Sequence, residues 1–475
     1  MTPNLSASLS YRIQELMRRD VLQFIEPLFP VEAIRAYVPE SKKKRRDRVF
    51  NMENTFLTMI ITAIHEDKSL QNAVNIFQEV FHRSHQESFD QTIKEQQLLQ
   101  TASAKSTPKR GRPRLFKVKV ATSKTKPISQ NTGAYSRARD RVEQGLIDSV
   151  YAATMQPQGL DCVKPWHGRI VYNTDGTYFQ MQDTQEIPDI YRAQKSGDGI
   201  LQGYPQGLLQ VLTQHGSGII ADYRIAARRD SELKQMASMC ESIAPNSLIL
   251  GDDLYNCYAM ICLCIQRGID IIVPDKKDRT FEVIRTIAPG DTIVRIKKPA
   301  VIKPLVAGQI LPQYLTLRRI TYADILDPLV QHVLLTTILD ETIEKTEIVT
   351  KYSGRWDVEI TIREVKTMMG MNIARSQSED MVFKEMGVAI IAYNLLRRII
   401  AESTKETVFP PETDIFQKLF AHRAPALVDR KGRVYSRWAP GRPSDCIRKG
   451  HQAHNSSPTR AALHEKNQSG EISKI

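Results

Sequence analysis

The most informative segment for the architecture of this chain is Leu248-Ile249-Leu250-Gly251-Asp252. Apolar and small residues end here in a carboxylate, which predicts a short buried strand. The apolar segment that follows predicts a helix ended by Gly268, and Ile271-Ile272-Val273 predicts a second buried strand. A strand, a helix and a strand in this order indicate an α/β architecture.

The residues upstream extend this pattern. Arg169 to Asp175 predicts a strand that leads into Asp175-Gly176-Thr177. Residues 208–212 and 219–223, joined through Gly216-Ser217-Gly218, predict a hairpin. A helix is expected over 231–243, with Asp230 or Ser231 placed to cap it.

The residues downstream predict a group of strands followed by two helices. Residues 280–340 hold four short strand-like runs, which predict a β-rich insertion, placed at about 275–340. A long helix is expected to begin near Glu344. A second helix, Met381 to Ser403, is apolar nearly all round and should be buried.

Residues 1–100 predict a helical N-terminal domain, with apolar positions repeating at three and four in Tyr11–Met17 and Met52–Ile61. Between them lies the cationic run Ser41–Arg46. This run is interpreted equally as a solvated loop or as a phosphate contact, and a nuclear signal is the least favoured interpretation. Residues 101–130, rich in Lys, Ser, Thr, Pro and Gly, predict a basic linker, and residues 441–475 predict a disordered tail.

Within the linker, Lys109-Arg110-Gly111-Arg112-Pro113-Arg114 resembles the AT-hook. Proline holds such a segment extended, glycine lets the backbone approach the DNA, and arginines favour the negative potential of a narrow minor groove. Arg110 and Arg112 are therefore candidate DNA-binding residues.

The composition limits the classes of protein. A chain of 475 residues exceeds one hydrophobic core, so two or three domains are expected. No apolar run approaches the roughly 20 residues of a membrane span, the N-terminus lacks a secretory pattern, and the six cysteines lack zinc-site spacing. A net charge of +13 suggests a polyanionic partner, nucleic acid first, although a basic surface that only aids solubility would carry the same charge.

The most informative candidate site residues lie between Tyr352 and Lys366. On a regular helix Tyr352, Arg355, Glu359 and Lys366 fall within about 60° of arc and share one face. A carboxylate flanked by a phenol and two cations suits a site that holds a divalent ion and binds DNA phosphates. A solvated charged face would show the same pattern.

The spacing of Tyr352, Arg355, Glu359 and Lys366 resembles the Y-(2)-R-(3)-E-(6)-K signature of bacterial insertion-sequence DDE transposases. The other motifs of this family have similar counterparts here. They are Asp175-Gly176-Thr177 followed by Asp183-Thr184, Leu250-Gly251-Asp252 followed by Tyr258, Asn131 to Arg139 at the opening of the domain, and Ala392 to Arg397 near its end.

This resemblance implies a ribonuclease H-like fold, an α/β mixed sheet with flanking helices, in a catalytic domain over residues 131–440. It implies that Asp175, Asp252 and Glu359 are the catalytic carboxylates and metal ligands, with Asp253 a poor second to Asp252. Two Mg²⁺ ions, with Mn²⁺ as a substitute, would support in-line phosphoryl transfer.

The same resemblance assigns Tyr352, Arg355, Trp356 and Lys366 to DNA phosphates at the cleaved end. The expected partners are double-stranded DNA, as transposon ends and target, and a second copy of the chain, with no membrane. The expected location is the bacterial cytoplasm, associated with the nucleoid.

One departure leaves the route of second-strand cleavage open. Some relatives stabilise a DNA hairpin with a tryptophan from the insertion, whereas the tryptophans here are at 166, 356 and 438. The candidate substitutes for this tryptophan are Phe281, Tyr314 and Tyr322, although a role in packing is the more favoured interpretation of each. The pair Arg318-Arg319 is interpreted as solvated charge.

Three alternatives remain. A protein of the same fold could bind element ends without cutting, an architectural protein could use the segment from Arg110 to Arg114 alone, and a nuclease of the same fold could cut without joining ends. The intact carboxylates argue against the first, and the four ordered motifs against the second.

Overall fold

The computed structural model describes residues 49–79, 131–155, 163–192 and 203–405, apart from positions 66, 229, 276–278, 325–326 and 328, with residues 34 and 36 and two short strands near the C-terminus. The chain divides into two compact units, Met1–Ala421 and His422–Ile475. In the second unit, the described residues form the antiparallel pair β10 (Leu427–Val428) and β11 (Val434–Tyr435).

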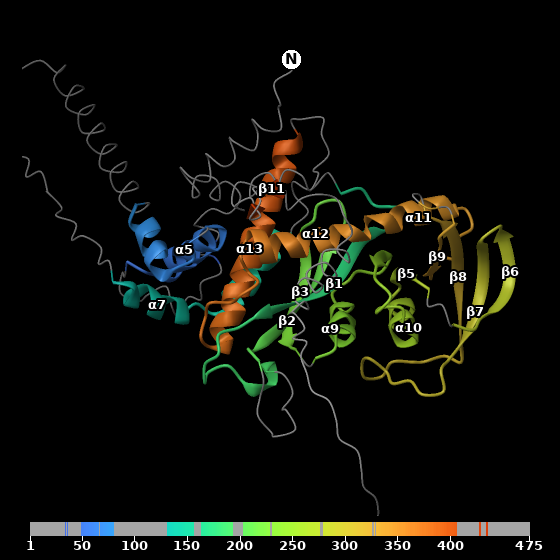
Figure 1. Cartoon of the computed structure of the whole chain (residues 1–475), viewed down its shortest axis with the longest axis horizontal. Helices are drawn as coiled ribbons and strands as arrows, with labels where there is room; N and C mark the ends of the chain where they lie inside the picture. The colour runs from blue at the N-terminus through green and yellow to red at the C-terminus, as the bar shows by residue number, and fades with distance from the viewer. Residues whose placement is uncertain are drawn as a thin grey trace, which may run out of the picture. The chain divides into compact units, whose positions relative to one another are not determined.

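A nine-stranded sheet with the order β3-β2-β1-β4-β5-β9-β8-β7-β6 forms the centre of the first unit (Figure 1). Its strands are β1 (Ile170–Gln180), β2 (Gln206–Gln214), β3 (Ile220–Ala227), β4 (Ser247–Leu250), β5 (Asp270–Pro274), β6 (Glu282–Ala288), β7 (Asp291–Lys297), β8 (Tyr314–Ala323) and β9 (Gln331–Thr336).

The sheet is mixed. Strands β1, β4 and β5 run parallel to one another, while β2 and β3 form an antiparallel hairpin beside β1. The four strands of the insertion are all antiparallel, and β9 pairs with β5. The β-rich insertion is therefore continuous with the sheet.

The helices in the described part of the chain cover both faces of this sheet. They include α5 (Met52–Ile64), α7 (Thr132–Asp140), α8 (Gln144–Thr154), α9 (Glu232–Met239), α10 (Tyr258–Gln266), α11 (Lys345–Ser353), α12 (Asp357–Arg363) and α13 (Glu379–Lys405). Strand β4 shows how the faces separate, because successive side chains of a strand point to opposite sides. Ile249 packs in the core with α9 and α10, whereas Leu248 and Leu250 pack in the core with α11.

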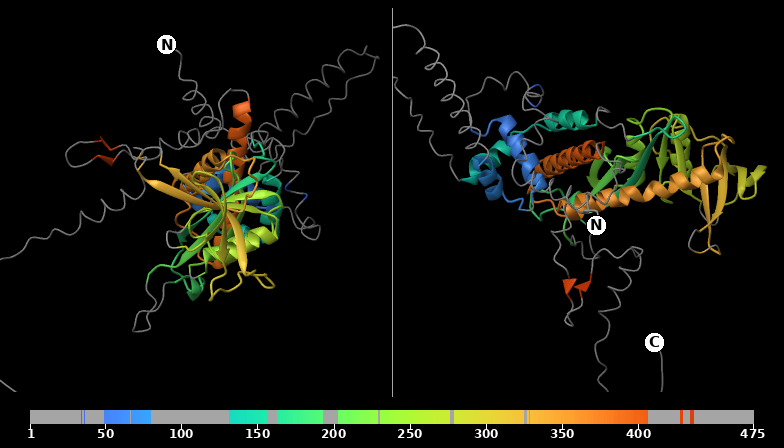
Figure 2. Two further views of the ribbon diagram at one scale, coloured as in Figure 1. Left: turned by 90° about the vertical axis from the view of Figure 1, so that its right-hand side faces the viewer. Right: turned by 90° about the horizontal axis from the view of Figure 1, so that it is seen from above.

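The long helix α13 joins the N-terminal helices to the sheet. It lies beside α5 in Figures 1 and 2, and the two helices share a core with α8. Asn394 of α13 accepts a hydrogen bond from the Ile220 backbone N–H at 2.9 Å and donates one to the Ile220 carbonyl at 3.0 Å. This amide fixes α13 against the first residue of β3.

The structure confirms the predicted strands, the hairpin, the β-rich insertion and the buried helix α13. It corrects two bounds and one predicted cap. Strand β1 does not end at Asp175 but continues to Gln180, helix α9 ends at Met239 rather than near 243, and the Ser231 side chain makes no capping hydrogen bond. The mixed α/β sheet with flanking helices is as expected.

The interpretation of Arg318 as a solvated charge is wrong. Its side chain is 1% exposed, and its guanidinium donates to both carboxylate oxygens of Asp291, at 2.9 and 2.6 Å. Arg319 pairs with Asp275 and lies over the Phe281 ring at 4.6 Å. These arginines therefore join β7, β8 and the end of β5.

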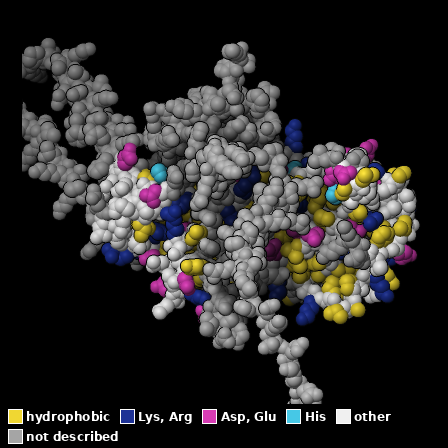
Figure 3. All heavy atoms as spheres, viewed as in Figure 1, with side chains coloured by type: hydrophobic (Ala, Val, Ile, Leu, Met, Phe, Trp, Pro, Cys, Tyr) yellow, Lys and Arg dark blue, Asp and Glu magenta, His cyan; other side chains and the backbone are white. Residues whose placement is uncertain are grey.

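The insertion also presents apolar side chains to solvent. Hydrophobic side chains gather on the surface at the right of Figure 3, over α10 and the strands of the insertion. Large exposed apolar residues in this part of the chain include Ile265, Val301 and Ile310. Tyr314 is also half exposed, with Arg295 over its ring at 5.7 Å.

Several sequence-based predictions lie outside the described residues. They are the helix at 11–17, the cationic run at 41–46, the linker with Arg110 and Arg112, and the tail at 441–475. Among the residues that the structure does describe, no helix has both the length and the apolarity that a membrane crossing requires.

Candidate active site

Asp175 lies in the middle of β1, on the face of the sheet that α11 and α12 cover. The alternation of β1 fixes this face, because Val171 packs in the core with α11 and every second residue points the same way. Its neighbours on this face are Asn173 and Thr177, which contact residues of the segment 354–366.

Asp252 lies beside Asp175 because of the parallel register of β1 and β4. Asn173 pairs with Leu250, so two residues further along each strand bring Asp175 level with Asp252. Strand β4 has ended by then, and the Asp252 carboxylate accepts a hydrogen bond from the Leu254 backbone N–H at 2.9 Å. The neighbouring Asp253 is exposed.

Glu359 comes to the same place from α12. Its carboxylate accepts a hydrogen bond from the Arg355 guanidinium at 3.0 Å. Arg355 is buried, with 8% of its surface exposed, so this contact is shielded from solvent on the arginine side. The structure thus brings together Asp175 of β1, Asp252 just after β4, Glu359 of α12 and Arg355 of the turn before α12.

The charges of these groups affect one another. The pKa of Asp175 is raised to about 6, mainly by burial and also by the negative charges of Asp252 and Glu359, while the Gly176 backbone N–H and Arg355 act to lower it. Burial also raises the pKa of Asp252, with Asp253 adding to the rise. A cluster of carboxylates that repel one another favours a cation between them.

Mg²⁺ fits this donor set in chemical type, because it binds carboxylate oxygens. In the described part of the chain, no three Asp, Glu, His or Cys side chains are grouped so that they could hold a metal ion together as they stand. Glu359 is the carboxylate that Arg355 engages. A cation bound by all three carboxylates would therefore have to compete with this ion pair.

Two hydrogen bonds hold the segment 352–356 against the strands. The Tyr352 hydroxyl donates to the Gly251 carbonyl at 3.2 Å, and the Asn173 amide donates to the Gly354 carbonyl at 3.1 Å. Gly354 is required here, because a Cβ atom at this position would come within 2.3 Å of the His215 ring. Tyr352 and Asn173 thereby position Arg355 and Glu359 over β1.

Trp356 and Lys366 differ in their exposure. Trp356 is 53% exposed, and the Arg355 guanidinium lies over its ring at 4.6 Å. Lys366 is half-buried and donates to the Thr177 hydroxyl at 2.9 Å, two residues along β1 from Asp175. Burial lowers the pKa of Lys366.

The expectation of one regular helix over 352–366 is wrong. A 3₁₀ turn at Gly354–Trp356 separates α11 from α12, and a π-helical turn at Glu364–Met368 follows α12. A 3₁₀ turn advances more degrees per residue than an α-helix and a π turn fewer, so a regular helical wheel does not apply. The four side chains nevertheless all contact the site or its two strands.

The central region of the chain matches a known family. Residues 166–395 match the family model described as the transposase DDE domain. This region is therefore similar to the DDE domain of transposases. The match spans Asp175, Asp252 and Glu359 and ends within α13.

Two curated relatives come from Escherichia coli (strain K12). The chain is 26% identical over 274 residues to the transposase InsG for insertion sequence element IS4, and this aligned region covers 56% of this chain and 60% of that protein. It is 27% identical over 171 residues to the putative transposase InsZ, covering 34% of this chain and 57% of that protein. The chain therefore spans about three fifths of the length of the curated relatives it matches.

Among solved structures, a piggyBac transposase synaptic complex with hairpin DNA is similar with a TM-score of 0.37 and 12% identity, covering 93% of this chain and 90% of that one.

Sequence reasoning missed two residues that border the candidate carboxylates. Asn173 has a usable signal, because it lies two residues before Asp175 and so shares its face of the strand. Glu232 has none, since an acidic residue in the first turn of α9 is what helix capping alone would favour. Burial and the charge of Asp252 raise the pKa of Glu232.

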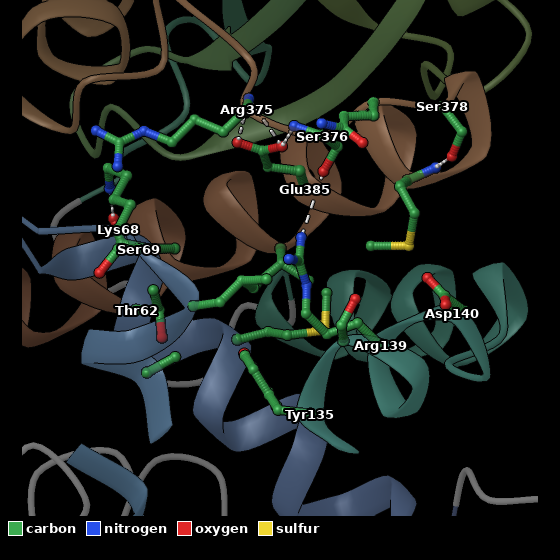
Figure 4. A pocket seen from close by; sticks show the side chains of 18 of the residues that line it. Thr62, Lys68, Ser69, Tyr135, Arg139, Asp140, Arg375, Ser376, Ser378 and Glu385 are labelled. Carbon is green, nitrogen blue, oxygen red and sulfur yellow. Dashed lines mark hydrogen bonds between the residues drawn. The ribbon is translucent and has the colours of Figure 1, made fainter. Parts of the chain in front are cut away.

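A pocket of about 430 Å³ lies away from these carboxylates, between α5, α7 and the start of α13 (Figure 4). Its walls carry both signs of charge, including Lys68, Arg139, Arg375 and Glu385. The Glu385 carboxylate accepts hydrogen bonds from the backbone N–H groups of Arg375 and Ser376, at 3.0 and 2.8 Å. None of the three candidate catalytic carboxylates lines this pocket.

Proposed function

We propose that this chain is a DNA transposase that cleaves DNA at transposon ends and joins those ends to target DNA. One observation carries this proposal. Asp175 on β1 lies beside Asp252, which follows the end of the adjacent parallel strand β4, and Glu359 comes to them from α12, within a region that matches the transposase DDE domain.

The strand order supports the finer assignment to the ribonuclease H-like fold. Antiparallel β1, β2 and β3 followed by parallel β4 and β5 give the order β3-β2-β1-β4-β5 before the insertion begins. The first aspartate is on β1, the second follows β4 and the glutamate is on a later helix, as expected for that fold. The spacing of Tyr352, Arg355, Glu359 and Lys366 supports membership of the Y-(2)-R-(3)-E-(6)-K signature group.

Asp175, Asp252 and Glu359 would hold the divalent ions, two Mg²⁺ with Mn²⁺ as a substitute. When bound, such ions activate water or a 3′-hydroxyl and stabilise the leaving oxygen in an in-line displacement. The residues of the chain provide position and charge. Arg355 holds Glu359 over β1 before ions bind, and its guanidinium is then available to a DNA phosphate.

The DNA end would lie along the segment 352–366. Trp356 is exposed beside Arg355, which suits a contact with a nucleotide, and Tyr352 and Lys366 flank the carboxylates on either side. Arg110 and Arg112 would bind the minor groove of A·T-rich DNA through the linker. We further propose a helical N-terminal domain at 1–100, a catalytic domain at 131–440, a homodimer in the DNA complex, and a cytoplasmic, nucleoid-associated location.

A strand-transfer assay tests this proposal against its two competitors. Purified chain is incubated with DNA that carries the element's ends, a supercoiled target plasmid and Mg²⁺, and the products are examined for joined ends. Joined products are expected. Cleavage without joining would indicate a nuclease of the same fold, and end binding without cleavage would indicate a silent DNA-binding protein.

A further inference from the structure

A fourth carboxylate borders the site on the other face of β1. Glu232 is the first residue of α9, which packs on the face opposite to α12. A Cβ atom built on Gly176 would lie 2.6 Å from the Glu232 carboxylate carbon and 2.7 Å from its Oε2. The Glu232 carboxylate therefore lies directly against the backbone of the residue that follows Asp175, and only glycine leaves it that space.

An unpaired amide oxygen faces the same point. Gln210 pairs with Gly176 across β1 and β2 and is fully buried. Its Oε1 lies 2.9 Å from the Cβ position built on Gly176, and it accepts no hydrogen bond. A buried polar atom without a partner normally costs about 1–3 kcal/mol, so its orientation calls for a ligand.

The orientation of this amide is fixed by its other end. The Gln210 Nε2 donates to the Thr174 hydroxyl at 2.9 Å and to the Tyr255 hydroxyl at 2.8 Å. The Thr174 hydroxyl donates in turn to the Val211 carbonyl, so it acts as an acceptor towards Gln210. Turning the amide over would break this arrangement, and Oε1 therefore stays directed at the space beside Gly176 that the Glu232 carboxylate also borders.

Negative charges gather around this point. Asp252 is close enough to Glu232 to raise its pKa, and both Asp175 and Glu232 act on the nearby Tyr255 hydroxyl. Two carboxylates and an amide oxygen are hard donors of the kind that Mg²⁺ and Mn²⁺ bind.

We propose that Glu232, Gln210 and Asp252 form a divalent-cation position on the α9 side of the catalytic centre. Glu232 would then be a fourth metal-binding carboxylate beside Asp175, Asp252 and Glu359. The inference rests on the proposed function, since it takes Asp252 to be a metal ligand. A cation here would satisfy Gln210 Oε1 and balance Glu232 and Asp252 together.

A neutral Glu232 that donates a hydrogen bond to Gln210 Oε1 would also satisfy the amide. The variant Glu232→Gln separates the two arrangements, because its amide N–H can make the same hydrogen bond but has no charge to bind a cation. A matched control is Glu241→Gln, which removes a carboxylate from an exposed ion pair with Arg267 just after α9.

The test is isothermal titration of Mn²⁺ into the DNA-free, full-length chain. We expect Glu232→Gln to weaken Mn²⁺ binding by about ten- to a hundredfold, Asp252→Asn to weaken it at least as much, and Glu241→Gln to leave it unchanged. Glu232→Asp, which keeps the charge but withdraws it by one methylene, should also bind more weakly than the native chain. It serves as a second variant if Glu232→Gln folds poorly.

The outcomes separate this inference from the proposed function. Native affinity in Glu232→Gln, with weakened binding in Asp252→Asn, would overturn the fourth ligand and leave the three-carboxylate centre intact. The absence of Mn²⁺ binding by the native chain would overturn the inference whatever the strand-transfer assay shows. Loss in both variants with the control unaffected would establish it.

Discussion

At the scale of single residues, the buried carboxylate of Asp175 has the clearest measurable consequence. Its pKa of about 6 lies above the ordinary value of 3.8, so the folded chain holds this proton more tightly than the unfolded chain. The stability that the protonated Asp175 carboxyl contributes is fully present below the ordinary pKa of 3.8 and is lost as the pH rises through about 6. At neutral pH the residue therefore destabilises the fold.

We expect Asp175→Asn to raise the free energy of unfolding at about pH 7.5 by on the order of 1–2 kcal/mol after allowance for solvent screening, and so to raise the melting temperature. The gain should shrink as the pH falls towards 4, because the native carboxyl is then protonated as well. Thermal melts at several pH values in a chelating buffer measure it. Asp189→Asn, in an exposed ion pair, is the control, and an equal gain at all pH values would contradict the prediction.

Arg355 supplies the positive charge of the site in the absence of a metal ion. Arg355→Gln removes the partner of Glu359 and a positive charge that lowers the pKa of Asp175. We expect the variant to be less stable than the native chain by about 1–3 kcal/mol without divalent ions. Millimolar Mg²⁺ should narrow the difference, since ligand binding stabilises the folded state. A deficit that Mg²⁺ leaves unchanged would argue against ion binding at these carboxylates.

The sequence predicts these residues unequally. Spacing and resemblance locate Asp175, Asp252, Glu359 and Arg355 because each falls in a short local motif. Glu232 and Gln210 could not be found in this way, because their proximity to Asp175 depends on the packing of α9 and β2 against β1. The burial of Arg318 was also missed, because its partner Asp291 is on another strand.

At the scale of secondary-structure elements, one buried ion pair fixes the end of the site helix. Glu364, in the π-helical turn after α12, accepts a hydrogen bond from the Arg397 guanidinium at 2.6 Å and from the Tyr393 hydroxyl at 2.9 Å. Glu364 is fully buried, and Arg397 is nearly so. The π turn ends the helix that carries Glu359, and α13 thereby holds it in place.

Removing one partner of this pair should be costly. We expect Glu364→Ala to lower the free energy of unfolding by about 3–5 kcal/mol, because it leaves the Arg397 charge buried without its carboxylate. The double change to Glu364→Leu and Arg397→Met should cost less than Glu364→Ala alone. Urea unfolding of the two variants measures this, with Glu241→Gln as an exposed control. A larger loss of unfolding free energy in the double variant than in Glu364→Ala would contradict the attribution of that loss to an unpaired buried charge.

The interruption of α11 and α12 explains why a regular helical wheel was not sufficient. Periodicity predicts that a segment is helical, but it does not distinguish 3₁₀ and π turns from α-helix when the hydrogen bonds change by one residue. Here the 3₁₀ turn coincides with Gly354, which packs against His215 from the hairpin between β2 and β3. This cause lies in the tertiary structure.

At the scale of the whole molecule, the order of strands and helices was predictable, but their pairing was less so. Apolar runs and turn residues gave β1, the hairpin, β4, α10 and β5 in sequence. The sequence did not predict that the insertion extends the same sheet through the pairing of β9 with β5. The pattern of residues in a strand does not determine which strand pairs with it. The packing of α5 against α13 likewise depends on contacts between distant segments.

The most direct measurement is cleavage of DNA that carries the element's own ends, in Mg²⁺, by the native chain and by Asp252→Asn and Glu359→Gln separately. We predict that the native chain cleaves and that each substitution abolishes cleavage, while both variants still bind the ends in a gel-shift assay. Binding without cleavage by the native chain, under conditions in which a related transposase cuts, would contradict the enzymatic claim. Cleavage that survives either substitution would contradict the assignment of these carboxylates.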